Sequence, residues 1–153
     1  MGSRRQAREF ALMILYGMDL SRSPADAAVS GFLETFATGE VLDPVPGFIS
    51  RQPDRLERPS KDVEAHLRRL VFGVSSELEA IDAAITQTSS NWRLDRMSCV
   101  DRNLLRLSAY ELLFLGEEIP RKVAINEAVE LAKGFGSKES GAFVNGLLDR
   151  LRG

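Results

Sequence analysis

The sequence predicts an all-α fold, in which about seven helices form a compact bundle of two packed helical subdomains. Apolar residues recur at steps of three and four along most of the chain, which is the spacing of one face of a helix. Serine and glycine residues that can cap helices stand at several ends of these stretches. No stretch shows the alternation of apolar and polar residues, bounded by hairpin turns, that is typical of strands.

The first predicted helix covers residues 3–20 and carries three arginines near its start. Its apolar stripe consists of Ala7, Phe10, Ala11, Ile14, Leu15 and Met18. We place Arg4, Arg5 and Arg8 in the first turns, away from that stripe. Cations at this end oppose the helix macrodipole by a few tenths of a kcal/mol each, so their presence favours a bound polyanion. Ordinary solvated surface charge is the simpler alternative.

The middle of the chain contains two further helices and a loop. Ser23 and Pro24 start a helix that runs to about Thr38. Residues 39–60 hold four of the six prolines and show little periodicity, so they predict a long surface loop. Residues 61–87 then predict one long helix, with a bend at Gly73.

The most apolar helix begins after Ser98, whose side chain is expected to cap it. Apolar residues occupy nearly every side of this helix as far as Gly116, so it should be surrounded by other helices. Before it, residues 92–97 predict a short helix whose Trp92 fills the core.

Two amphipathic helices over residues 123–148 close the chain and are joined by a corner that contains two glycines. Ser137 can cap the second of them. The corner also brings together Lys133, Lys138 and Phe143. Phe143 lies on an apolar stripe, so the residues alone leave open whether it belongs to the core or offers a stacking surface.

Composition restricts the class of protein. The chain has 153 residues, 44% of them apolar and 27% charged, which is typical of one globular domain, and it contains no apolar run long enough for a membrane span. The single cysteine cannot form an internal disulfide, so we expect a reducing cytoplasm. The net charge is −2, but both chain ends are weakly basic, which suggests one small anion-binding surface.

No pattern in the sequence indicates catalysis, a metal or a cofactor. His66 and Cys99 are the only histidine and cysteine, too few for a metal site and an improbable catalytic pair. Residues 134–136 lack the third glycine and the preceding strand of a nucleotide-binding loop. Glu127 and Glu130 share a helix face, and a solvated face explains them better than a bound cation. We therefore expect a protein that binds rather than catalyses.

Three stretches carry a resemblance to a known family. They are RRQAREFALMILY (Arg4–Tyr16), NWRLDRMSCVDRNLLRLSAYEL (Asn91–Leu112) and IPRKVAINEAVELAKGFG…FVNGLLD (Ile119–Asp149). Together they resemble the transcription antitermination factor NusB family over most of the chain outside residues 39–60. The proline-rich loop looks longer than that family would lead us to expect.

The resemblance implies a single domain over residues 1–153, with one helical half over about 1–90 and the other over about 91–153. It further implies binding of single-stranded boxA-type RNA from ribosomal RNA leader transcripts. The RNA-binding residues would be Arg4, Arg5, Arg8, Lys138, Glu139 and Phe143. Tyr16 and Asp101 would face NusE, the ribosomal protein of the small subunit that acts as a partner. The pair would join RNA polymerase and other Nus factors to suppress premature termination.

Other hypotheses remain open at this stage. The bundle could be an adaptor that binds only proteins. The chain also resembles the helical RNA-binding module fused to certain ribosomal RNA methyltransferases, although the catalytic domain of such enzymes is not expected here. The sequence does not decide whether the free protein is a monomer or a homodimer.

Overall fold

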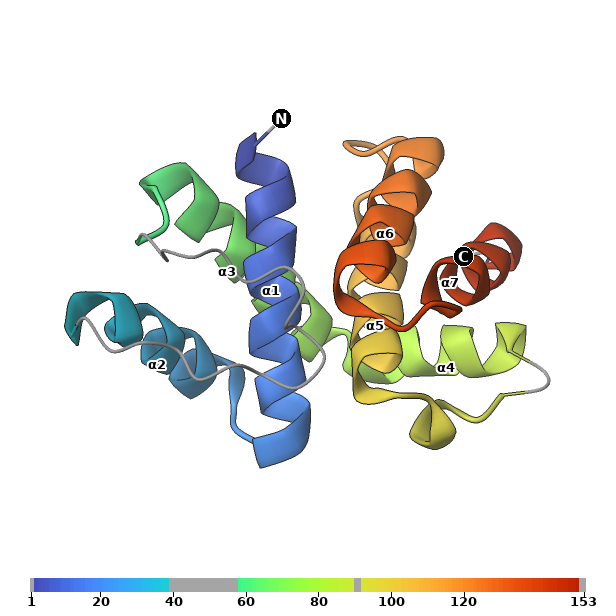
Figure 1. The fold of residues 1–153 in the computed structure, drawn as a ribbon, viewed down its shortest axis with the longest axis horizontal. Coiled ribbons are helices and arrows are strands. Elements are labelled where there is room, and N and C mark those ends of the chain that lie inside the picture. The colour runs from blue at the N-terminus through green and yellow to red at the C-terminus, as the bar shows by residue number, and fades with distance from the viewer. Residues whose placement is uncertain (1, 39–57, 90–91, 152–153) are drawn as a thin grey trace.

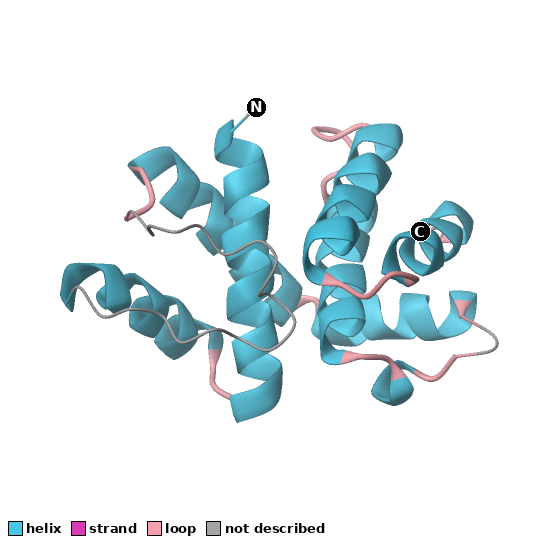
Figure 2. Cartoon of the chain, in the orientation of Figure 1, coloured by secondary structure: helices cyan, strands magenta, loops and turns pink. Residues whose placement is uncertain are grey.

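The computed structural model describes residues 2–38, 58–89 and 92–151. Within these ranges the chain is helical, and Figure 2 shows helices joined by loops and no strand. The helices are α1 (Gly2–Ser21), α2 (Ala25–Thr38), α3 (Lys61–Ser76), α4 (Leu78–Thr88), the short 3-10 helix η2 (Leu94–Arg96), α5 (Cys99–Phe114), α6 (Arg121–Phe135) and α7 (Ser140–Arg150). The predicted all-α fold is confirmed. Most of the predicted proline-rich loop lies outside the described residues.

The helices pack in two groups that meet along α5 (Figure 1). α1, α2 and α3 pack on one another, and α4, α5, α6 and α7 form the second group. Contacts of α5 with α1 and α3 join the groups. None of the described helices combines the length and apolar character needed to cross a lipid bilayer. The organisation as a single domain, with one helical half over about 1–90 and the other over about 91–153, stays a prediction.

The central position predicted for α5 is confirmed. Ser98 caps it, since its Oγ accepts a hydrogen bond from the backbone N–H of Asp101 at 3.1 Å. Leu104, Leu105 and Leu107 are fully buried on different sides of the helix, against α1, α3, α4, α6 and α7. A helix with apolar residues all round is stable only when neighbours cover every face, and here they do.

The predicted long helix over residues 61–87 is wrong in one respect. The chain leaves helical geometry at Glu77 (φ −107°, ψ 18°), where α3 ends and α4 begins in a new direction. Gly73 stays inside α3, where its role is close packing: a Cβ atom there would overlap the ring of Tyr110. The break lets α4 pack on α5 and α7 and so join the second group of helices.

Trp92 does not fill the core, contrary to the sequence-based prediction. Its relative exposure is 57%, and it precedes η2 on the connection between α4 and α5. Met97, at the end of the same connection, is buried instead. The Met97 side chain therefore anchors the short 3-10 segment in the core, and the Trp92 side chain stays at the surface.

Candidate nucleic-acid interface

Arg4 and Arg5 lie in the first turns of α1 and extend toward different neighbours. Arg4 is exposed, and its Nη1 lies 3.5 Å from both ring nitrogens of His66 on α3. Arg5 is half-exposed and forks onto Glu127 of α6, with two N–O distances of 3.1 Å. α1 thus begins between α3 and α6, with one guanidinium group held by a carboxylate and the other next to an imidazole.

The imidazole of His66 is neutral at physiological pH. Burial, and then the positive charges of Arg4, Arg8 and Arg69, lower its pKa to about 4. A neutral ring cannot cancel the charge of Arg4. Among the arginines at the start of α1, Arg4 is therefore the one whose positive charge the described neighbouring side chains neutralise least.

Arg8 does not lie away from the apolar face, as the sequence led us to expect. Its relative exposure is 4%, and it forms a forked ion pair with Glu111 of α5, with distances of 2.8–3.1 Å. The reason is that α1 is covered on two sides, by α3 and by α5. Arg8 and the fully buried Leu12 lie on the side of α1 that α5 covers. In this conformation Arg8 is not accessible to a ligand.

The corner between α6 and α7 forms the second part of the candidate interface. Lys138 and Glu139 are exposed there, and Phe143 is half-buried in the first turn of α7. An open groove of about 700 Å³ runs beside the corner between the two helices. Its lining includes Lys133 and Lys138 together with the amides Asn126 and Asn145.

The expected capping of α7 by Ser137 is reversed. The backbone N–H of Ser137 donates to Oγ of Ser140 at 2.9 Å, and the two hydroxyl groups lie 3.1 Å apart. These bonds fix the corner just before Lys138 and Glu139 leave it. The corner is thus a defined turn that holds two charged side chains in solvent.

The two cationic segments do not share one groove. The two weakly basic chain ends suggested one small anion-binding surface, but α5 and α6 stand between α1 and α7 (Figure 1). Glu130 of α6 borders both the α6–α7 groove and a small hollow beside Arg5 and Glu127. The surface that connects the arginines to the corner therefore runs along α6 and passes two carboxylates.

Phe143 has an aromatic neighbour that the sequence did not indicate. Its ring centroid lies 5.7 Å from that of Trp92, with an interplanar angle of 72°, which is an edge-to-face contact. Phe143 thus packs partly against the hydrophobic core and partly against an exposed indole. This contact does not decide whether Phe143 acts as a core residue or as a stacking surface.

The residues expected to face a protein partner lie at the other end of α1. Tyr16 is 7% exposed and burial raises the pKa of its hydroxyl, with Cys99 as a further cause. Asp101, in the first turn of α5, is partly buried. Asp19 joins the two helices here, because its Oδ2 accepts hydrogen bonds from Arg102 at 2.8 Å and Asn103 at 2.9 Å.

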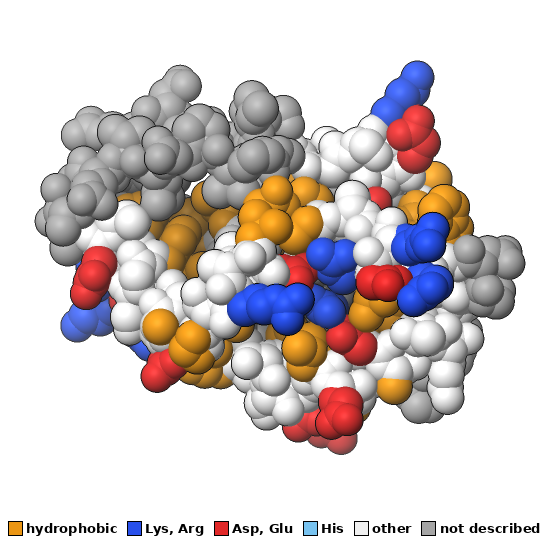
Figure 3. Space-filling model, turned by 90° about the horizontal axis from the view of Figure 1, so that it is seen from below, with side chains coloured by type: hydrophobic (Ala, Val, Ile, Leu, Met, Phe, Trp, Pro, Cys, Tyr) orange, Lys and Arg blue, Asp and Glu red, His pale blue; other side chains and the backbone are white. Residues whose placement is uncertain are grey.

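Basic and acidic side chains alternate on this lower face of the molecule (Figure 3). An open hollow of about 500 Å³ is lined there by Asp19, Arg22, Thr86, Arg93, Leu94, Asp95, Arg102 and Arg106. Such mixed charge is suited to a polar protein partner. The role of Tyr16 and Asp101 in that contact stays a prediction.

The structure keeps the side chains of His66 and Cys99 apart, at different neighbours. His66 neighbours Arg4 and Cys99 neighbours Asp19. Arg4 and Asp19 lie near opposite ends of α1, about 22 Å apart along the helix at about 1.5 Å per residue. Burial and the Asp19 carboxylate raise the pKa of the Cys99 thiol, which disfavours the nucleophilic thiolate. No cluster of three potential metal ligands is found in the described ranges.

Sequence reasoning missed the carboxylates that hold the arginines. Glu111 follows a tyrosine inside the most apolar helix, and a charged residue at such a position is a signal for a buried ion pair. The sequence places Glu127 on a solvated face, with a bound cation as the alternative, whereas α6 turns it toward Arg5. The partners of both carboxylates lie more than a hundred residues away, at a separation that no local pattern reveals.

Comparison with known proteins gives a consistent answer over the whole chain. The model of the NusB family matches residues 5–152. Transcription antitermination protein NusB of Trichlorobacter lovleyi is 46% identical over 151 residues, which cover 99% of this chain and 91% of the relative. The protein of the same name from Myxococcus xanthus is 44% identical, with coverage of 99% and 95%.

Solved structures agree with this result. NusB of T. maritima is 35% identical and superimposes with a TM-score of 0.73, covering 96% of this chain and 88% of that one. A crystal structure of the antitermination factors NusB and NusE in complex with double-stranded RNA contains a chain that is 28% identical, with a TM-score of 0.72 and coverage of 97% and 95%. The chain belongs to the NusB family.

Proposed function

We propose that the protein is a transcription antitermination factor that binds single-stranded boxA-type RNA together with NusE. In this role it joins the antitermination complex of RNA polymerase and other Nus factors, acts in the cytoplasm and works by binding rather than by catalysis. Support comes from the family match over the whole chain and from the relative that was crystallised with NusE and RNA.

The position of Arg4 is the observation that carries the RNA-binding part of the proposal. Arg4 is exposed beside a neutral His66, so its guanidinium group is available to a phosphate. Arg5 can exchange its exposed contact with Glu127 for a phosphate oxygen. Lys133 and Lys138 provide a second set of cations at the far end of α6. A strand of RNA that follows α6 would meet both sets.

The proposal specifies unpaired RNA, and a duplex is the natural comparison. Bases in a single strand are free to stack on aromatic side chains, whereas those of a duplex are paired and stacked within it. The half-buried Phe143 near Lys138 is of use only to unpaired bases. We expect a single strand to bind more tightly than a duplex of the same sequence.

A double substitution of Arg4 and Arg5 by alanine tests the RNA site. We expect weaker binding of boxA-type RNA and a shallower dependence of log K on log salt, by up to about 1.4 because each phosphate contact contributes roughly 0.7. Fluorescence anisotropy of labelled RNA at several salt concentrations measures both. Arg8 is left unchanged because it is buried and its loss would disturb the fold.

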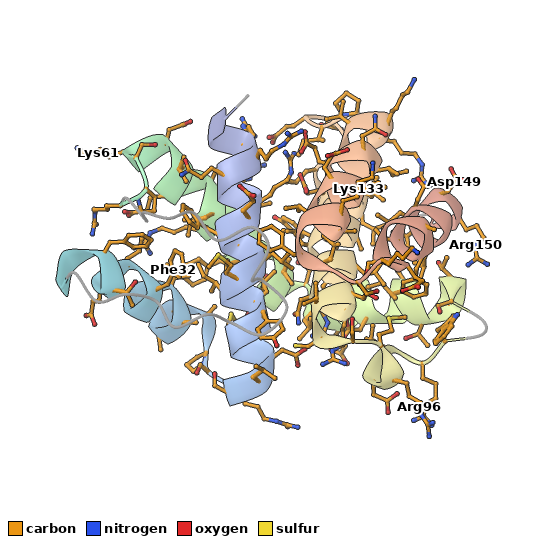
Figure 4. All side chains as sticks on the ribbon, viewed as in Figure 1. Phe32, Lys61, Arg96, Lys133, Asp149 and Arg150 are labelled. Atoms are coloured by element: carbon orange, nitrogen blue, oxygen red, sulfur yellow. The ribbon has the colours of Figure 1, made fainter. Side chains whose placement is uncertain are left out.

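The matched control is the double substitution Arg68→Ala and Arg150→Ala, which removes the same charge elsewhere. Arg68 lies on α3, and Arg150 ends α7 on the side away from α1 (Figure 4). If both double variants bind RNA equally well, α1 does not contact RNA as proposed.

A protein-only adaptor is the second candidate, and one observation favours it. Glu111 and Glu127 already hold two of the three α1 arginines, so the protein alone offers few free cations. An adaptor would bind NusE with an affinity that does not depend on RNA and would show no binding of RNA alone. Titrations of RNA with and without NusE therefore separate the two functions.

The substitution Asp101→Lys tests the partner surface. We expect it to weaken NusE binding and leave the affinity for RNA alone unchanged, because Asp101 lies at the start of α5 and the arginines lie at the start of α1. The Ser98 cap remains, so α5 should stay folded. Calorimetric titration with NusE provides the measurement.

Glu79→Lys is the matched control for Asp101→Lys. It reverses an exposed acidic charge in the first turn of α4 in the same way. Equal effects of the two substitutions on NusE binding would show that net charge, and not the Asp101 contact, is responsible.

A further inference from the structure

Trp92 is an exposed aromatic residue held by a fixed backbone. It is the only tryptophan of the chain, and 57% of it is accessible to solvent. Its carbonyl oxygen accepts a hydrogen bond from Oγ of Ser89 at 2.9 Å, and η2 follows two residues later. An indole left in water forgoes the stabilisation that burial would provide, and its face is accessible to a ligand.

Trp92 adjoins the RNA-binding corner through Phe143. The edge-to-face contact of the two rings joins the α4–α5 connection to the first turn of α7. Lys138 and Glu139 leave the corner one turn before Phe143. The two rings therefore form an apolar surface that continues the proposed interface beyond the corner.

Basic side chains follow Trp92 directly. Arg93 is highly exposed, and its only described partner is Asp95, which is equally exposed, at 3.1 Å. Such a pair in solvent is weak and opens readily. Arg96 lies in η2 and points away from the helices (Figure 4). Both guanidinium groups can reach a phosphate, with the Asp95 carboxylate as the opposing charge beside Arg93. Arg93 also lines the hollow of the lower face, so this path would border the expected partner surface.

We infer that Trp92 and Phe143 together form a platform on which an unpaired RNA base stacks, while Arg93 and Arg96 contact the backbone of the same strand. This inference rests on the proposed function and extends its RNA site to the α4–α5 connection. Aromatic faces and cations arranged along one path are the features by which proteins hold single strands. Paired bases cannot use the platform, so it also provides a reason for preferring single strands.

The single tryptophan allows a direct test. Fluorescence of the full chain, excited at a wavelength that tryptophan but not tyrosine absorbs and titrated with short single-stranded boxA-type RNA, reports on Trp92 alone. We expect quenching that saturates at the RNA concentration at which the anisotropy of labelled RNA saturates. The corresponding duplex should quench much less.

Substitutions of Trp92 measure how much the platform contributes to RNA affinity. Trp92→Ala should weaken single-strand binding by roughly five- to 150-fold, the range measured for the loss of one stacked base. Trp92→Phe keeps an aromatic face and should retain most of the affinity. Phe114→Ala removes another exposed aromatic residue, on α5, and should leave RNA binding unchanged. Thermal melts followed by circular dichroism check that each variant is folded.

The outcomes separate this inference from the proposed function. Normal RNA binding with unchanged Trp92 emission and full affinity of Trp92→Ala would overturn the platform and leave the proposed function standing. A loss of affinity in Trp92→Phe as large as that in Trp92→Ala would also overturn stacking as the cause. If the protein binds no RNA at all, both fall together.

Discussion

Replacing Arg8 with alanine should lower the free energy of unfolding by about 3–5 kcal/mol. Arg8 and Glu111 are almost completely buried where α1 meets α5, and their forked contact pairs the two opposite charges. Removal of the guanidinium group leaves a carboxylate without a counter-charge in a poorly solvated site. This contact also joins the two groups of helices, so its loss affects the whole fold.

Urea denaturation measures this effect, and two controls define its origin. Arg5→Ala breaks a similar forked pair at the surface and should change stability far less, because water and salt screen it. The double substitution Arg8→Met and Glu111→Leu removes both charges and should recover most of the loss. If Arg8→Ala is no less stable than Arg5→Ala, the ion pair does not hold the fold together.

The loss in the free energy of unfolding caused by Arg8→Ala should also depend on pH. Burial raises the pKa of Glu111 in the native protein, against the opposing hydrogen bonds and charge of Arg8. Without Arg8 the folded carboxyl group takes up a proton at a higher pH than the unfolded one does. Its destabilising effect is therefore full at high pH and shrinks as the pH falls through the raised pKa. Repeating the denaturation at lower pH measures this change.

Replacing Asp19 with alanine should cost about 2–3 kcal/mol, the value of charged hydrogen bonds lost from a largely buried site. Asp19 Oδ2 accepts from Arg102 and Asn103, and the Arg106 guanidinium group lies 3.6 Å away. The substitution removes the carboxylate that joins the end of α1 to the start of α5. Arg102 keeps the carbonyl oxygens of Leu94 and Met97, which limits the loss.

The pH dependence of this second effect has a definite sign. Burial disfavours the charged form of Asp19, but the hydrogen bonds from Arg102 and Asn103 and the nearby positive charges outweigh it and hold its pKa below the usual 3.8. The stabilisation is therefore fully present above pH 3.8 and is lost as the pH falls through the lowered value. Asp19→Ala should match the native protein only in strong acid.

Asp26→Ala is the matched control for Asp19→Ala. Asp26 is exposed in the first turn of α2, where its Oδ1 accepts a hydrogen bond from the backbone N–H of the next residue, Ala27. Denaturation at neutral and acidic pH should show little change for this variant. A difference between native protein and Asp19→Ala that stays constant down to the lowest pH would contradict the lowered pKa.

The parts of the fold that depend on local pattern could be predicted from the sequence. The all-round apolar character of residues 99–114 and the cap at Ser98 define α5 without any knowledge of its neighbours. The apolar stripe on α1 likewise predicts a buried side, on which Phe10 packs against Phe32 and Phe36 of α2. These features follow from helical spacing and capping, which act within a few residues of each other.

The sequence-based predictions were wrong where residues far away in the sequence determine how a side chain or helix is placed. Arg8 is buried because Glu111 provides the matching charge, and a stripe-based argument cannot see this partner. The break at Glu77 is imposed by the packing of α4 on α5 and α7, since the apolar spacing continues unchanged through it. Trp92 was assigned to the core on size and hydrophobicity alone, whereas Met97 fills that place.

The candidate site was predicted mainly through resemblance. The residues alone indicated cations at both chain ends and a corner with lysines, and the structure places these along α6 rather than in one groove. That Arg5 is held by a carboxylate could not be foreseen, since it depends on how α6 is rotated about its axis. The assignments of RNA and partner residues stay predictions.

The most direct test of RNA binding together with NusE is a titration of labelled single-stranded boxA-type RNA with the protein, alone and with NusE. A scrambled strand of equal composition is the control. We expect saturable binding that is tighter for the boxA-type strand, weakened by salt and strengthened by NusE. Equal affinity for both strands at every salt concentration, or no binding in the presence of NusE, would contradict it.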